Sequence, residues 1–225
     1  MISKKGLSVL VLIVCCVGNP GNQESESISL PDIGLKGSSD IHEVVFDRRS
    51  QRSFSEDALT QEHVSDLMWA AGGKTVDGIS GATRAYPSAG GLYPLDFFIV
   101  VKNVDGLQRD IYRYNWKDHS ITPQGLSDRI PDVVASTFSP TLSRSDAAAL
   151  IVITADFSVT TARYSRRGER RYVPMEAGAS AQNVALMAQA LGLSSYKIGA
   201  FDDKNLSSAL NLSTTDPLLI IPIGK

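Results

Sequence analysis

The stretch Pro87-Ser88-Ala89-Gly90-Gly91-Leu92-Tyr93-Pro94 stands shortly before an apolar run, Phe97-Phe98-Ile99-Val100-Val101. The apolar run is typical of a buried strand. In the segment before it, two prolines enclose mostly small residues, and these allow backbone amides to approach a flat or anionic ligand closely. Clusters of glycine, proline and serine also form ordinary loops, so a structural turn and a ligand cradle both remain open.

The composition is that of an ordinary soluble globular protein. The chain has 225 residues, of which 43% are hydrophobic and 20% charged, and this length is enough for one domain with a complete core. The formal net charge is −2. Proteins that bind nucleic acid usually carry a basic surface, so this charge argues against a nucleic-acid partner.

The first residues have the pattern of an export signal. Lys4 and Lys5 precede a short apolar run, residues 7–18, and this run is shorter than the roughly 20 residues that a membrane span needs. We therefore predict an extracytoplasmic protein, for example a periplasmic one, with no transmembrane span in the mature chain. The predicted organisation is a signal peptide (1–18), a flexible polar tether (19–39) and one domain (40–225).

Both cysteines, Cys15 and Cys16, lie in the predicted signal segment. Cleavage after Gly18 would also remove Lys4 and Lys5, which leaves 20 basic against 24 acidic residues and a net charge of −4. Such a mature chain has no disulfide, no thiolate metal site and no cysteine nucleophile. Lipid attachment at one of the two cysteines is the alternative, and it would anchor the protein to a membrane.

Three arginines fall within five positions in Arg48-Arg49-Ser50-Gln51-Arg52. Guanidinium groups match the geometry of phosphate oxygens, and a serine hydroxyl adds a further hydrogen bond. Charge clusters are most often solvated, and taken alone the segment favours that interpretation. A second basic stretch, residues 165–172, is likewise expected to be a solvated loop.

The other elements follow from apolar periodicity and cap residues. Helices are expected from Thr60 to Gly73, from Ser127 to Val134, over 175–191, and after Asp202 or Asp203. Strands are expected over 97–101, 111–116, 120–122, 147–154 and 217–223, and residues 74–84 are expected to form a loop. The helix over 175–191 is rich in alanine, so we expect it in the core or against a second subunit.

Several kinds of chemistry have no sequence signal. The three histidines, His42, His63 and His119, are too scattered for a metal site, and we predict none. The sequence contains no P-loop, no G-x-S-x-G and no G-x-G-x-x-G motif. Glu176 is the one carboxylate of the long helix, near the N-terminus where the dipole favours an anion, and an ordinary first-turn acid is the simplest interpretation.

Three segments, in this order, resemble the nitroreductase family: 48–52, 87–94 and Met175-Glu176-Ala177-Gly178-Ala179-Ser180-Ala181-Gln182-Asn183. The last two are similar to the SagB-type dehydrogenase branch, which Ile111-Tyr112-Arg113-Tyr114 and Leu191-Gly192-Leu193 also fit. The resemblance covers roughly residues 41–225. It implies an α+β fold with a mixed, mostly antiparallel sheet surrounded by helices, and a homodimer with one FMN at each subunit interface.

The resemblance also implies roles for individual residues. Arg48, Arg49, Ser50 and Arg52 match the segment that holds the phosphate, the ribityl chain and the pyrimidine edge of FMN. Pro87, Ser88 and Ala89 match the segment under the ring from the partner subunit, and Gly90 keeps the approach open. Glu176 and Ala177 match the pair beside the reactive N5 side of the flavin.

The sequence departs from the family pattern in three places. An Asn that is common in the middle motif is replaced by Gly90-Gly91-Leu92, and the chain stops at Lys225, the candidate for a basic residue that touches the phosphate. Azoline-oxidising members use a Lys-Tyr pair as the base, and Arg171-Tyr172 is the nearest match here. Because arginine cannot act as a base at neutral pH, Tyr172 is the catalytic candidate.

The function that the resemblance implies is an exported FMN-dependent oxidoreductase, which moves hydride or electrons to or from a small organic substrate. An exported protein cannot rely on cytoplasmic NAD(P)H, so the electron donor or acceptor stays open. Two alternatives remain: an azoline dehydrogenase that acts on modified peptides, and a flavin-binding module without catalysis on the same fold.

Overall fold

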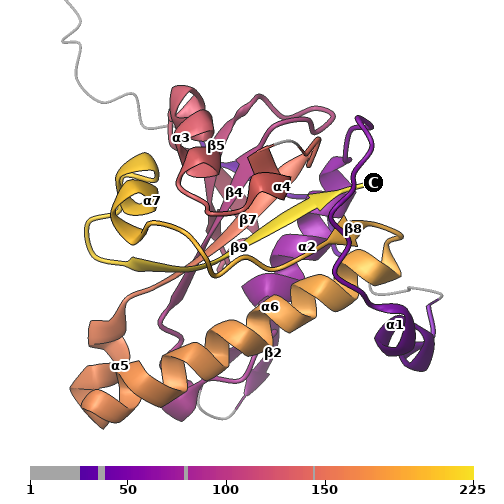
Figure 1. Cartoon of the computed structure of the whole chain (residues 1–225). Helices are drawn as coiled ribbons and strands as arrows, with labels where there is room; N and C mark the ends of the chain where they lie inside the picture. Colours follow the sequence, from indigo (N-terminus) through magenta and orange to yellow (C-terminus); the bar gives the residue numbers. More distant parts are fainter. Residues whose placement is uncertain (1–25, 35–38, 79–80, 144) are drawn as a thin grey trace, which may run out of the picture.

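A central antiparallel sheet organises the protein (Figure 1). The computed structural model describes residues 26–34, 39–78, 81–143 and 145–225. The predicted signal peptide and both cysteines therefore lie outside the described residues. The sheet has the order β1-β6-β5-β4-β7-β9-β8. Its strands are β1 (Ile28–Ser29), β4 (Leu95–Val101), β5 (Asp110–Asn115), β6 (Ser120–Pro123), β7 (Ala149–Ala155), β8 (Ser194–Ser195) and β9 (Asp216–Gly224).

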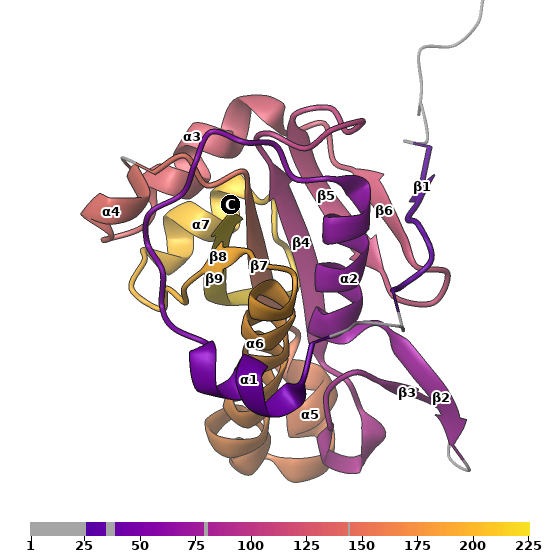
Figure 2. The ribbon, with the colours of Figure 1, turned by 90° about the vertical axis from the view of Figure 1, so that its right-hand side faces the viewer.

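Helices cover both faces of this sheet (Figures 1 and 2). The helices and helical turns are α1 (Ile41–Asp47), α2 (Gln61–Gly72), η1 (Ala89–Gly91), η2 (Ser127–Arg129), α3 (Ile130–Ala135), α4 (Pro140–Ser143), α5 (Phe157–Tyr164), η3 (Gly168–Tyr172), α6 (Val173–Ala190) and α7 (Asp203–Ala209). The ladders of the sheet are antiparallel, and one isolated parallel bridge joins Leu59 to Val104. The predicted α+β fold with a mostly antiparallel sheet is confirmed.

The central strands carry apolar residues on both faces, because helices cover both. On β4, Phe97 and Ile99 join the core with α2 and α6, whereas Phe98 and Val100 join the core with α3 and α7. Each such buried side chain contributes roughly 1.5–3 kcal/mol relative to exposure. Burial on both faces explains why these strands have continuous apolar runs instead of alternation.

Helix α6 is the long helix predicted over 175–191, and it packs against α2. Ser180 Oγ donates to Ala71 O at 2.6 Å, and Asn183 Nδ2 donates to Ala85 O at 2.7 Å. The expected hairpin is formed by β5 and β6, and the expected last strand is β9. Helix α2 begins after its cap Thr60 as predicted.

Two expectations about secondary structure are wrong. Residues 74–84 form a hairpin, β2 (Lys74–Gly78) with β3 (Gly81–Arg84), where Thr75 and Thr83 hydroxyls lie 2.8 Å apart. Threonine favours strands, and the flanking glycines concealed that preference. The basic stretch 165–172 is mostly helical, because arginine and glutamate are good helix formers. The helix expected from Ser127 to Val134 is confirmed as η2 followed directly by α3, although the Ser127 side chain does not cap it.

The predicted flexible tether is wrong for part of its length. Ile28 and Ser29 pair with β6, and the buried Leu30 donates its N–H to His119 O at 3.0 Å. An edge strand offers unpaired backbone groups, and β1 satisfies those of β6. Within the described ranges, no helix combines the length and the apolar character needed to cross a membrane.

Candidate functional site

The Gly-rich segment forms the short turn η1 between β3 and β4. Gly90 and Gly91 both have positive φ angles, 66° and 67°. A Cβ at Gly90 would lie 2.6 Å from Tyr164 Oη and 2.9 Å from Arg163 Nη1, whereas a Cβ at Gly91 would meet open space. The loop is therefore in close contact with the end of α5, and only glycine fits at position 90 without displacing Tyr164.

A buried carboxylate on α6 accepts a hydrogen bond from the backbone of this loop. Glu176, in the first turn of α6, accepts a hydrogen bond from Ala89 N at 2.9 Å and is only 4% exposed. Burial raises the pKa of Glu176, while the hydrogen bond from Ala89 N, the nearby Ser88 side chain and the charge of Arg84 oppose the rise. Its Oε2 has no hydrogen-bond partner among the described residues. Glu176 is thus more than a first-turn acid: it fixes the position of the loop backbone.

Arg84 is a buried cation at the base of the loop. Its guanidinium lies between 5.1 and 5.8 Å from the ring centres of four aromatic residues, Tyr86, Tyr93, Phe97 and Trp116. Nε donates to Gly72 O at 2.6 Å and Nη1 to Leu95 O at 3.2 Å. Burial lowers the pKa of Arg84, yet a guanidinium remains charged in proteins. The four rings and two carbonyls lock the end of β3 against β4, and so fix both ends of the loop.

Tyr172 lies one aromatic ring away from the loop. Its ring packs edge-on against Tyr164 with 4.9 Å between centroids, and Tyr164 Oη faces Gly90. The structure therefore brings the Gly-rich loop close to Glu176 and Tyr172, although the loop lies more than 80 residues before them in the sequence. Pro87 and Gly90 are exposed, and Ser88 and Ala89 are half-buried. Ala177 is buried in the core, so only its backbone could contact a ligand.

The Arg-rich segment forms a second group of site residues, beside β8. Gln51 N donates to Ser195 O at 3.0 Å, and the guanidinium of Arg52 stacks over Tyr196 at 5.2 Å. Lys197 Nζ donates to Gln182 Oε1 at 2.7 Å. Burial, together with the nearby charge of Arg48, lowers the pKa of Lys197. We call Arg48, Arg52 and Lys197 the basic group.

The remaining predicted residues have other contacts. Arg49 donates to Asp47 O at 2.9 Å, and Ser50 is exposed and accepts from Arg52 through its carbonyl at 3.4 Å. Lys225 accepts from Ser55 N through its carbonyl at 2.7 Å. The pKa of His63 is lowered by burial and then by the charge of Lys225, which places that charge near the start of α2.

The two groups face different sides of α6. Glu176 and Asn183 are seven residues apart and share the face toward α2 and the loop, since about 3.6 residues make one turn. Gln182, which binds Lys197, is rotated by about 120° from that face. Within one chain, the loop and the basic group are therefore two separate halves of a site.

Three site residues were missed by sequence reasoning. Lys197 follows Tyr196 outside any charge cluster, and Tyr164 ends a helix that was not predicted. Arg84 gave no signal either, because arginine is almost always exposed unless it is paired. The pair Gly90-Gly91 was the one signal in the sequence that this loop is closely packed.

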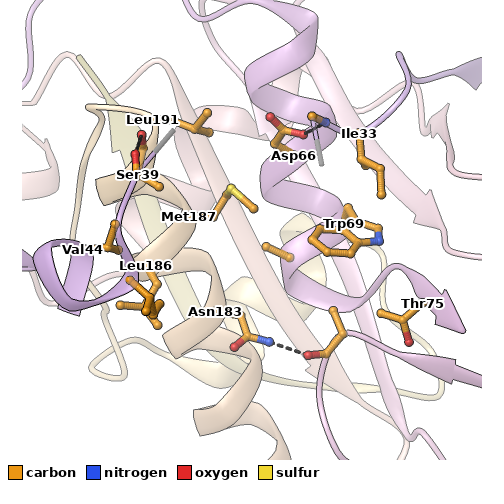
Figure 3. A pocket seen from close by; sticks show the side chains of 15 residues that line it. Ile33, Ser39, Val44, Asp66, Trp69, Thr75, Asn183, Leu186, Met187 and Leu191 are labelled. Carbon is orange, nitrogen blue, oxygen red and sulfur yellow. Dashed lines mark hydrogen bonds between the residues drawn. The ribbon is translucent and has the colours of Figure 1, made fainter. Parts of the chain in front are cut away.

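A largely apolar pocket of about 690 Å³ opens between α6 and α2 (Figure 3). Trp69 from α2 and Leu186 and Met187 from α6 line it, with Asp66 and Asn183 as polar members. Helix α1 adds Ile41 and Val44 at one end. In the described part of the chain, no cluster of three His, Cys, Asp or Glu residues could hold a metal ion.

Comparison with known proteins gives the same family from sequence. The profile of the nitroreductase family matches residues 45–225. A candidate nitroreductase of Methanocaldococcus jannaschii is 34% identical over 203 residues, which covers 90% of this chain and 98% of that protein. Both matches include the basic group, the Gly-rich loop and the start of α6.

Solved structures share the fold. A candidate nitroreductase of Ralstonia eutropha has a TM-score of 0.75 at 23% identity, over 92% of both chains. A chain of the Escherichia coli microcin synthetase McbBCD complex, solved with truncated pro-MccB17 bound, has a TM-score of 0.67 at 22% identity, over 99% of this chain and 84% of its own. A candidate nitroreductase of Desulfovibrio desulfuricans, solved in complex with FMN, has a TM-score of 0.58 at 20% identity, over 83% and 86%.

The family profile spans most of the chain, and the M. jannaschii relative aligns over nearly its whole length. The structure carries the matching α+β fold. The protein belongs to the nitroreductase family of oxidoreductases.

Proposed function

We propose that this protein is an FMN-dependent oxidoreductase of the SagB-like branch, which moves hydride or electrons to or from a small organic substrate. The observation that carries the proposal is the loop at Ala89–Gly91, held from behind by the buried Glu176 and free of side chains at Gly90 and Gly91. The FMN complex of the D. desulfuricans protein with the same fold supports the choice of cofactor.

The residues present fit FMN in three respects. The basic group offers three cations for a phosphate, and arginine matches phosphate geometry in particular. The exposed Gly90 leaves backbone at the surface, where a flat ring can approach. The unpartnered Oε2 of Glu176 is a buried polar atom that calls for a partner. Arg49, Ser50 and Lys225 remain proposed phosphate or ribityl contacts.

The protein's own residues then have distinct tasks. Bound FMN supplies hydride and one-electron chemistry, and the protein supplies position, charge and access. The basic group binds the phosphate and orients the cofactor. Glu176 and Arg84 keep Ser88 and Ala89 in place under the ring. Tyr172 is the proposed catalytic residue, and its neighbour Tyr164 closes the side next to Gly90.

We also propose that the functional form is a homodimer with the site shared between subunits. The loop and the basic group lie on different sides of α6, as expected when each copy supplies one half of the site. Exposed apolar side chains support this: Ile41, Val45 and Phe46 are exposed on α1, the helix that lines one end of the apolar pocket through Ile41 and Val44 (Figures 2 and 3). Burying such a surface against a second copy is favourable.

Export remains part of the proposal. Lys4, Lys5 and the apolar run that follows them support a signal peptide, with lipid attachment at Cys15 or Cys16 as the variant that would retain the protein at a membrane. Cell fractionation with mass spectrometry of the mature N-terminus decides between them. A cytoplasmic full-length chain would contradict both.

Binding of FMN and riboflavin to the flavin-free protein tests the cofactor assignment. Riboflavin lacks the phosphate, so we expect it to bind at least about tenfold more weakly, since charge-assisted hydrogen bonds contribute roughly 1.5–3 kcal/mol each. In Lys197→Gln, the affinity for FMN should fall toward the affinity for riboflavin. The distant Arg129→Gln should leave both affinities unchanged. Equal affinities for the two flavins, or no binding, would contradict the proposal.

A second candidate function is dehydrogenation of azolines in modified peptides. Two observations favour it: the McbBCD chain has the same fold, and the ring of Tyr172 packs against Tyr164, which contacts the loop at Gly90. Tyr172→Phe should then abolish oxidation of an azoline peptide while leaving FMN binding intact. If FMN binds but no donor reduces it, the protein is a flavin-binding module without catalysis.

A further inference from the structure

At one corner of the molecule α5 ends and η3 leads into α6 (Figure 1), and five arginines belong to this part of the chain. We call them the arginine corner: Arg163, Arg166, Arg167, Arg170 and Arg171. All five are exposed, and Glu169 is the only acidic residue between positions 157 and 175. The corner thus has a net charge of +4 in a chain whose total is −2.

The corner is a rigid element instead of a solvated loop. Gly168 packs against α5 so closely that a Cβ there would lie 2.9 Å from the carbonyl carbon and oxygen of Thr160. The rings of Tyr164 and Tyr172 pack edge-on across the same junction. The arginines are therefore presented on a fixed surface, where they lose less entropy on binding a ligand.

The positive charges are left without neutralising carboxylates. Among the described residues, no carboxylate lies within ion-pair distance of any of the five. Arg166 and Arg170 are four residues apart, as are Arg167 and Arg171, and like charges at that spacing destabilise a helix by a few tenths of a kcal/mol per pair. All five are arginine, although the chain also uses lysine elsewhere, and arginine suits planar carboxylates and phosphates.

The corner is continuous with the candidate site. The Nη1 atom of Arg163 lies against Gly90, next to Tyr164 Oη. A molecule that occupies the exposed side of the Gly-rich loop therefore has Arg163 at its edge and the other arginines beyond it. Because Arg163 contacts the Gly-rich loop, the corner is better placed to bind a reactant of the flavin site than a partner elsewhere on the surface.

We propose that the arginine corner binds the anionic groups of the enzyme's reactant, and that this reactant is a small organic molecule with two or more carboxylates or phosphates. The inference rests on the proposed function and names the substrate class of that site. The corner also raises the local concentration of such anions, which speeds their association with the site.

Direct binding of two probes, citrate and tripolyphosphate, tests the inference by calorimetry on the purified protein. We expect Arg166→Gln/Arg167→Gln to weaken binding at least about fivefold, since each exposed pair contributes up to about 1 kcal/mol. The matched control is Arg109→Gln/Arg129→Gln, which removes the same charge at the other end of β4, roughly 20 Å away. A preference for citrate indicates a carboxylate reactant, and a preference for tripolyphosphate a phosphate one.

Affinity in the unmodified protein must also fall steeply with salt, because exposed charges are screened. This measurement needs no variant, so a misfolded double variant does not remove the test. No binding, salt-independent binding, or equal weakening by the control pair would overturn the inference. These outcomes do not depend on flavin, whereas failure of the proposed function is a protein that binds no FMN.

A redox measurement connects the corner with the site. Reduced FMN gives two electrons, either to two ferricyanide trianions, which become ferrocyanide, or with two protons to neutral benzoquinone, which becomes hydroquinone. We expect Arg166→Gln/Arg167→Gln to slow reoxidation by ferricyanide severalfold at low salt and to leave reoxidation by benzoquinone unchanged. Equal effects on both acceptors would overturn the role of the corner at the site.

Discussion

At the scale of single residues, Glu176 and Gly90 determine the shape of the loop from opposite sides. Glu176 accepts the Ala89 N–H from behind, and Gly90 leaves room for Tyr164 and Arg163 in front. Arg84 adds a buried charge that ties both ends of the loop to the sheet and to α2. The resemblance placed Glu176 beside the flavin, and its hydrogen bond with Ala89 N gives it a positioning task toward the loop as well.

Substitution of Glu176 separates its hydrogen bond from its charge. Glu176→Gln keeps an oxygen for Ala89 N and should fold at least as stably as the unmodified protein at pH 7. Glu176→Ala leaves that buried N–H unpaired and should lower the free energy of unfolding by about 1–3 kcal/mol. Urea unfolding of the three proteins measures this. Equal stability of the Gln and Ala variants would contradict the positioning role.

The same pair has a pH signature. Because burial raises the pKa of Glu176, the folded protein holds this proton more tightly than the unfolded chain does. The folded state is therefore penalised progressively as pH rises above the ordinary value of about 4.5, and not below it. Glu176→Gln should remove this part of the pH dependence of unfolding, and an unchanged profile would contradict it.

Gly90 and Gly91 form a matched pair for testing the close contact. Both have positive φ, so alanine costs roughly 1–2 kcal/mol of backbone strain at either position. Only Gly90→Ala also drives a methyl group into Tyr164 and Arg163. We expect FMN affinity to fall more in Gly90→Ala than in Gly91→Ala, as measured by fluorescence titration. Equal losses would show that the contact with α5 is unimportant.

At the scale of elements, the N-terminal segment is fastened to α2 and to the β5–β6 turn through one histidine. Ser65 Oγ donates to Pro31 O at 2.6 Å and lies 2.8 Å from His119 Nε2, and Tyr114 Oη lies 2.8 Å from His119 Nδ1. Because the Ser65 proton is used on Pro31, the network assigns the ring proton to Nε2, and Nδ1 accepts from Tyr114. The neutral ring fits this arrangement.

Acid should loosen this attachment. Burial lowers the pKa of His119, although backbone contact with Pro31 and the charges of Asp66, Asp32 and Asp118 oppose the shift. The stabilisation is thus complete above the ordinary value of 6.5 and is lost as pH falls below it toward the folded pKa. His119→Asn, which tolerates the positive φ at this position, should flatten the rise in stability between about pH 5 and 6.5.

Urea unfolding across that pH range measures the effect. The control is His63→Gln. Burial also lowers the pKa of His63, so its contribution to the pH dependence must be separated from that of His119. We expect the pH dependence that remains in His63→Gln to disappear when His119→Asn is added. If the free energy of unfolding of His119→Asn changes with pH as steeply as that of the unmodified protein, the pH dependence comes from other residues.

At the scale of the whole molecule, a three-layer fold leaves one apolar side uncovered. Phe46 is 81% exposed on α1, the helix that contributes Ile41 and Val44 to the pocket between α6 and α2. Phe138, after α3, is 69% exposed on the other side of the sheet, so it serves as a control. If a second copy covers α1, Phe46→Glu should give monomers in analytical ultracentrifugation while Phe138→Glu leaves dimers. A monomeric unmodified protein, or dimers in both variants, would contradict the shared site.

Much of the fold could be predicted from the sequence, because its strongest signals are local. The apolar run 97–101, the Thr60 cap and the alanine-rich helix all lie where expected. The β2–β3 hairpin and the helical corner were missed since glycines and charges concealed their propensities. The contact of Glu176 with Ala89 spans 87 residues, and no periodicity reveals it. The resemblance to the family assigned these distant segments to one site. The contacts in the structure added Arg84, Tyr164 and Lys197 to it.

The most direct test of the central claim is the visible spectrum of the purified mature protein, with the released flavin identified. We predict flavin absorbance, FMN at about one per subunit, bleaching on anaerobic reduction and recovery with an added acceptor. A colourless protein that fails to bind added FMN would contradict the cofactor assignment. The Gly-rich loop and the basic group would then have no role in flavin binding.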